Sequence, residues 1–137
     1  MTNIILIFLL ILISSASKAI MDTLQFHYDT SVFKNVKNQN WWNPAVSHLN
    51  KYKNRDSRQG RRFFGSTTFL VFLTDAWHFF QEIFLDTLIF SILLGININV
   101  TFKWWYWLVA YLLIKIVMGS FFELFYSIIL KKKDKVA

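Results

Sequence analysis

Three long blocks of apolar residues constrain this chain more than any other feature of its sequence. They occupy residues 4–21, 69–94 and 104–130, and 55% of the whole chain is hydrophobic. At about 1.5 Å of rise per residue, a helix over each block is long enough to cross the hydrocarbon core of a bilayer. The blocks therefore predict an all-α integral membrane protein with three transmembrane helices in one domain, residues 1–137.

Polar and basic segments flank these blocks. The predicted domain consists of helix 4–21, a basic amphipathic connector at 22–62, helix 69–94, helix 104–130 and a lysine tail at 131–137. Met21, Leu24, Tyr28 and Val32 recur at helical spacing, so the first helix is expected to continue past the membrane into the connector. Asn97 and Asn99 lie in the short turn between the second and third helices.

The distribution of positive charge predicts the topology. Nine Lys and Arg lie in the stretch 18–62, which covers the end of the first block and the connector: Lys18, Lys34, Lys37, Lys51, Lys53, Arg55, Arg58, Arg61 and Arg62. The short loop near Asn97 contains one basic residue, Lys103, whereas the C-terminal tail is rich in lysine. Because cytoplasmic loops carry the excess of Lys and Arg, the chain is predicted to be N-out and C-in.

Two interpretations of the first block remain open. Small residues at Ser14 and Ala16, or at Ser17 and Ala19, are typical of a signal-peptide cleavage site, but no Lys or Arg precedes the apolar core. Cleavage would leave the basic connector outside the membrane, against the charge rule. The sequence therefore favours a retained signal-anchor over a cleaved signal peptide.

Five tryptophans are expected to anchor the protein at the membrane interfaces, because Trp is enriched at headgroup level. They are Trp41, Trp42, Trp104, Trp105 and Trp107. The net charge of +7 is arranged around apolar blocks, which favours a bilayer with anionic headgroups as partner and argues against nucleic acid. The chain has no cysteine, which excludes disulfides, thiolate metal sites and a cysteine nucleophile.

Ionisable residues interrupt the second block. They are Asp75, His78, Glu82 and Asp86, with steps of three, four and four, which place them on one helix face. Since charge inside a membrane is costly, this row must face protein, water or an ion. The third block adds Lys115 and Glu123. Lys115 is expected to pair with Glu82, and Glu123 with Asp75, His78, Arg61 or Arg62. The small residues Gly119 and Ser120 indicate the face of the third helix that contacts the second.

Three interpretations of this intramembrane polar network are open. The groups can satisfy one another and hold a helical bundle together, which is the default for buried polar residues in membranes. Asp75, His78, Glu82 and Glu123 can form a metal or acid–base site, with His27 and His48 joining only if the connector folds back onto the bundle. The row can also form a proton or ion path in an oligomer. We expect no cofactor and no metal.

Four segments resemble a group of small bacterial and phage-associated membrane proteins of uncharacterised activity. The segments are KAIMDTLQFHY at 18–28, WWNP at 41–44, KYKN at 51–54 and GSTTFLVFLTDAWHFFQ at 65–81. The resemblance covers about the first 80 residues. It implies that the connector and second helix form one unit, and that the protein belongs to a bacterial inner membrane or a phage-associated membrane. The three-helix plan also resembles one class of phage holins in topology alone.

The sequence thus favours a non-enzymatic subunit or scaffold of a larger or homo-oligomeric membrane assembly. An oligomeric channel-like, proton-conducting or holin-like protein is the first alternative, and a metal-dependent membrane-embedded enzyme is the second.

Overall fold

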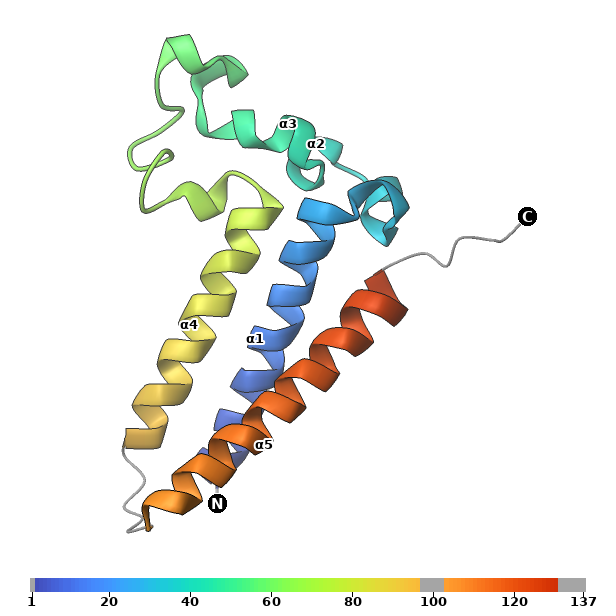
Figure 1. The fold of residues 1–137 in the computed structure, drawn as a ribbon. Coiled ribbons are helices and arrows are strands. Elements are labelled where there is room, and N and C mark those ends of the chain that lie inside the picture. Colours follow the sequence, from blue (N-terminus) through green and yellow to red (C-terminus); the bar gives the residue numbers. More distant parts are fainter. Residues whose placement is uncertain (1, 97–102, 131–137) are drawn as a thin grey trace, which may run out of the picture.

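The computed structural model describes residues 2–96 and 103–130. It is all-α, and three of its helices are long and apolar enough to cross a membrane, as the sequence predicts. They are α1 (Thr2–Phe26), α4 (Ala76–Ile96) and α5 (Trp104–Glu123), the last continuing as a π-helical stretch over Leu124–Leu130. The helices run up, down and up, so that the connector lies at the end opposite the N-terminus (Figure 1). The predicted turn at 97–99, the tail at 131–137 and the side chain of Trp104 lie outside the described residues.

The first helix is longer than the predicted 4–21. It continues to Phe26 because Met21 and Leu24 are buried against the bundle. It does not reach Val32, and two 3-10 turns follow instead, at Tyr28–Thr30 and Val32–Asn35. The hydroxyl of Ser31 donates to the Tyr28 carbonyl and accepts the Phe33 N–H, which gives the backbone an alternative to the helical bonds.

The second long helix begins at Ala76, seven residues after the predicted start at Phe69. Residues before it form turns and a 3-10 turn at Val71–Leu73. Thr74 donates its hydroxyl to the Val71 carbonyl at 2.7 Å, and Gly65 adopts a φ of +82° that a regular helix does not contain. The apolar composition of residues 69–74 predicted that they belong to the helix, but composition alone does not distinguish a helix from a turn.

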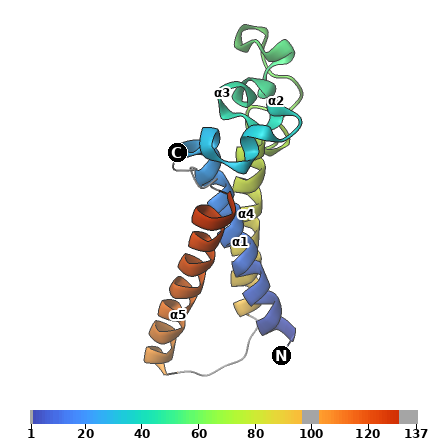
Figure 2. The ribbon, with the colours of Figure 1, turned by 90° about the vertical axis from the view of Figure 1, so that its right-hand side faces the viewer.

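Helix α1 packs against both α4 and α5, whereas α4 and α5 make few direct contacts. Figure 2 shows α5 splayed away from the other two helices at the end where α5 begins. The central helix presents small residues to its neighbours. The Ser14 hydroxyl donates to the Phe84 carbonyl of α4 at 3.5 Å, and the Ser15 hydroxyl to the Met118 carbonyl of α5 at 2.6 Å. Small side chains permit this close approach of the backbones.

The predicted contact face on the third helix is wrong. Gly119 and Ser120 are both exposed, and a Cβ added at Gly119 would meet no atom within 4 Å. The close packing instead uses buried small residues of α1, namely Ser14, Ser15, Ser17, Ala19 and Thr23. Because α1 occupies the central position, the third helix has no α4 surface to approach.

The connector folds into a cap over one end of the bundle (Figure 1). It contains two one-turn helices, α2 (Gln39–Trp42) and α3 (Pro44–Ser47), and further 3-10 turns at His48–Lys51, Lys53–Arg55 and Ser57–Gln59. Trp42 stacks on Phe33 with ring centroids 4.9 Å apart, and Trp41 lies 6.2 Å from Phe79 of α4. These two tryptophans therefore bind the cap to the start of α4. Trp105 and Trp107 are exposed on α5.

Candidate functional site at the start of α4

Asp75 and His78 form the most closely bonded ionisable pair of the row predicted from the sequence. The Asp75 side chain is buried, and its Oδ2 lies 2.7 Å from His78 Nδ1. Its Oδ1 accepts the backbone N–H of His78 at 3.0 Å, while the Thr74 hydroxyl donates to Oδ2 at 3.2 Å. Asp75 therefore precedes the helix as its N-cap, a position where a carboxylate satisfies free N–H groups and complements the helix dipole.

The carboxylate also orients the His78 ring. A carboxylate oxygen accepts hydrogen bonds, so the short contact fits Nδ1–H as the donor to Asp75. The ring packs edge-on against Trp77, with centroids 5.0 Å apart and planes at 84°. The pair thus holds His78 in one tautomer and one orientation.

A cavity of about 310 Å³ opens beside this pair. Its lining comes from the end of α1, from α3 and the residue after it, and from the start of α4: Gln25, Pro44, Ser47, His48, Asp75, Trp77 and His78. The connector therefore does fold back and bring His48 to the site. His27 does not join it, since its ring packs edge-on against Tyr126 at 5.3 Å. Sequence reasoning missed Gln25 and Ser47, because neither belongs to the ionisable row and nothing in their spacing marks them.

The chemistry available here is proton exchange and hydrogen bonding at His78. Within residues 2–96 and 103–130, no group of three or more His, Asp or Glu is placed to hold a metal ion. The predicted ligand set is not assembled, because Glu82 and Glu123 lie away from the Asp75–His78 pair. Glu123 instead accepts the Ser127 hydroxyl at 2.6 Å on the exposed side of α5.

The rest of the row turns gradually out of the bundle. His78 and Glu82 are half-buried, whereas Asp86 is exposed. Steps of four residues advance about 40° beyond a full turn of an α-helix, so the row winds from the packed face to the outer face. Of the three members of the row that lie within α4, only His78 and Glu82 therefore lie on the partly buried face.

The expected ion pair between Lys115 and Glu82 does not form within the described chain. Lys115 is exposed on α5, with its ammonium 5.7 Å from the centre of the Tyr111 ring. The interaction expected between Glu123 and Arg61 or Arg62 is also absent there, and Arg61 lies over the Phe64 ring. The Lys115–Glu82 prediction fails because α1 packs against both α4 and α5, which make few direct contacts with each other.

No family model, curated protein or solved structure matches this chain. The resemblance to small bacterial and phage-associated membrane proteins therefore stays a prediction.

Proposed function

We propose that this chain is a non-enzymatic integral membrane subunit that assembles with further copies of itself. The observation that carries the proposal is a pair of opposite charges on the outer faces of two spans. Asp86 lies midway along α4 and Lys115 lies well inside α5, and both are exposed. Within residues 2–96 and 103–130 neither side chain has a hydrogen bond or an ion pair.

Lipid is a poor environment for these two groups. A charged side chain at the centre of a span costs about 2.5 to 3.5 kcal/mol on insertion scales. Lys18 of α1 avoids this cost because it forms an ion pair with Asp22 one turn further on. Within residues 2–96 and 103–130 neither Asp86 nor Lys115 has an ion-pair partner, so association that covers them is favourable.

A second copy of the chain supplies the complementary charges. Within one copy α1 holds α4 and α5 apart, whereas α4 of one copy can lie beside α5 of another. Apolar side chains surround each charge, with Leu85 and Ile89 exposed near Asp86 and Leu112 exposed near Lys115. An intermolecular contact would therefore join opposite charges inside an apolar interface.

The proposal also includes the orientation of the chain in the membrane. The cap at residues 27–74 carries eight basic residues against two acidic ones: Lys34, Lys37, Lys51, Lys53, Arg55, Arg58, Arg61 and Arg62 against Asp29 and Asp56. This excess favours a cytoplasmic cap, with the N-terminus outside. Retention of the first helix as a signal-anchor is supported by its central packing, since cleavage after Ala16 or after Ala19 would remove the hydrogen bonds of Ser14 and Ser15 to both neighbours.

Charge reversal tests the assembly. Asp86→Lys should weaken self-association about tenfold, because it places two lysines at the contact. Lys115→Asp should weaken it similarly, and the double variant Asp86→Lys with Lys115→Asp should restore assembly by exchanging the two charges. The measurement is subunit counting by single-molecule photobleaching in liposomes over a series of protein-to-lipid ratios.

Lys103→Asp is the matched control, because Lys103 precedes α5 and lies outside the span. It should leave the subunit distribution unchanged. A monomer at every protein-to-lipid ratio would contradict the proposal, as would a double variant no better associated than either single one.

A further inference from the structure

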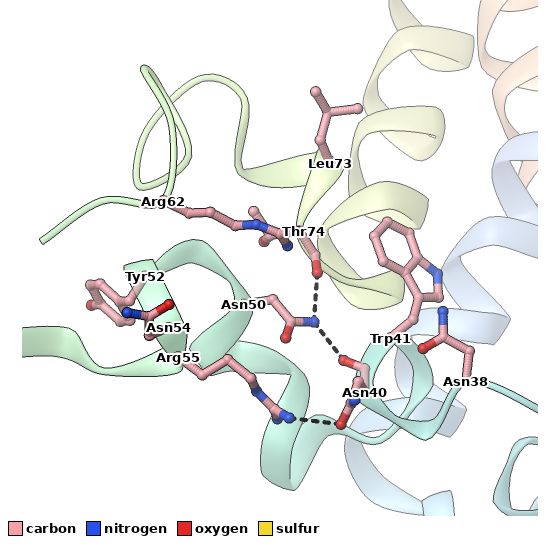
Figure 3. Close-up of a pocket in the computed structure, with 10 residues that line it drawn as sticks. All are labelled: Asn38, Asn40, Trp41, Asn50, Tyr52, Asn54, Arg55, Arg62, Leu73 and Thr74. Carbon is pink, nitrogen blue, oxygen red and sulfur yellow. Dashed lines mark hydrogen bonds between the residues drawn. The ribbon is translucent and has the colours of Figure 1, made fainter. Parts of the chain in front are cut away.

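The cap contains a polar cavity that the assembly does not use. It has a volume of about 470 Å³ and lies between the folded connector and the residues just before α4 (Figure 3). Pockets of this size hold small molecules or the head of a larger one. No acidic residue lines it, although Asp29, Asp56 and Asp75 lie in the same part of the chain.

The lining consists mainly of hydrogen-bond donors. Four asparagines contribute, Asn38, Asn40, Asn50 and Asn54, together with Arg55 and Arg62. Amide and guanidinium groups that converge without a carboxylate favour an anion with several acceptor oxygens.

The walls of the cavity are held by hydrogen bonds within the chain. The Asn50 side-chain amide donates to the Thr74 carbonyl at 2.9 Å and to the Asn40 carbonyl. The Arg55 guanidinium donates to Asn40 Oδ1 and to the Val46 carbonyl, each at 2.7 Å, while its buried Nε has no partner within the described residues. These bonds keep the cavity formed in the absence of a ligand.

Arg62 is the charge that remains free. Its side chain extends over the cavity toward Thr74 (Figure 3), and it has no hydrogen-bond acceptor or ion-pair partner within residues 2–96 and 103–130. On the opposite side of the cavity (Figure 3), Asn38 adopts a φ of +64°, and its exposed side chain makes no hydrogen bond within the described residues either. A guanidinium with all its donors unused matches the oxygens of a phosphate.

The position of the cavity brings it to the headgroup layer. Leu73 and Thr74, which line it, lie three and two residues before Ala76, the first residue of α4. When α4 spans the bilayer, its start lies at the boundary between hydrocarbon and headgroups. We propose that this cavity binds a phosphate group, with Arg62 as the main ligand and Asn38 as a second donor. The shared chemistry is the phosphate oxygens, whether of an anionic phospholipid or of a free phosphate.

The test is native mass spectrometry of the full chain in detergent, titrated with short-chain phosphatidylglycerol, short-chain phosphatidylcholine and inorganic phosphate. One equivalent of phosphatidylglycerol should bind, and Arg62→Gln should weaken binding about tenfold through loss of a charge-assisted contact. Arg58→Gln removes the same charge from an exposed site outside the cavity and should change binding less than twofold.

Asn38→Gly provides a second variant, because glycine tolerates the positive φ and the fold is retained while the amide is lost. It should weaken binding several-fold. If inorganic phosphate displaces the lipid with the same dependence on Arg62, free phosphate is the source, and if it does not, the source is the lipid headgroup. Equal weakening by Arg62→Gln and Arg58→Gln, or the absence of saturable binding, would overturn the proposal.

Discussion

Replacing Asp75 with alanine is expected to destabilise the protein by about 3 to 5 kcal/mol, because the change removes one partner of a buried, hydrogen-bonded pair. Two donors would lose their acceptor, the His78 backbone N–H and His78 Nδ1, whereas the Thr74 hydroxyl keeps the Val71 carbonyl. The first turn of α4 would also lose its cap. The measurement is the free energy of unfolding in mixed micelles, from titration with dodecyl sulfate followed by circular dichroism.

Two further variants separate the buried network from capping in general. Asp75→Asn keeps an acceptor oxygen for the His78 N–H and should cost less than Asp75→Ala. Asp56→Ala removes a cap in a more exposed place, where the carboxylate accepts the Arg58 N–H at 2.9 Å, and should cost about 1 kcal/mol or less. Equal losses for Asp75→Ala and Asp56→Ala would show that the network contributes nothing beyond a surface cap.

Replacing Ala19 with leucine is expected to overpack the buried cluster that Ala19 of α1 shares with Ala76, the first residue of α4. Ala19 and Ala76 are both fully buried and belong to one cluster with Leu24. A larger side chain has no space there, and overpacking of this kind costs about 1 to 3 kcal/mol. The same unfolding titration measures the loss, and a single cysteine introduced near each helix end would report the separation through spin-label distances.

The control makes the same substitution where there is room. Ala45 lies exposed in α3, so Ala45→Leu should change the free energy of unfolding by less than about 0.5 kcal/mol. If Ala19→Leu were equally neutral, the small residues of α1 would not determine how closely the helices approach.

The three spans follow from the sequence because long apolar runs report directly on the solvent that a segment prefers. The start of α4 does not, because residues 69–74 are mostly apolar like the helix after them, while their backbone forms a 3-10 turn and the Thr74 hydroxyl donates to the Val71 carbonyl. Composition reports the apolar character of such a segment, whereas the helix boundary depends on the cap at Asp75, which is a local hydrogen-bonding arrangement.

The sequence predicts the part of the candidate site whose residues are close together in the chain. Asp75 and His78 are three residues apart, so their contact follows from helix geometry alone. The pairing of Lys115 with Glu82 required knowing which helix lies in the middle, and no residue of the second or third block specifies that. The serines of α1 carried this information, but small residues there are equally typical of a signal-peptide cleavage region.

The central claim is that three helices cross a membrane, so that the cap and the turn between α4 and α5 lie on opposite sides. The chain has no native cysteine, so Ser57→Cys and Asn97→Cys each introduce a single label site. A membrane-impermeant maleimide applied to intact cells should label Asn97→Cys, and should reach Ser57→Cys only after permeabilisation. Labelling of both positions from the same side would contradict the three-span fold.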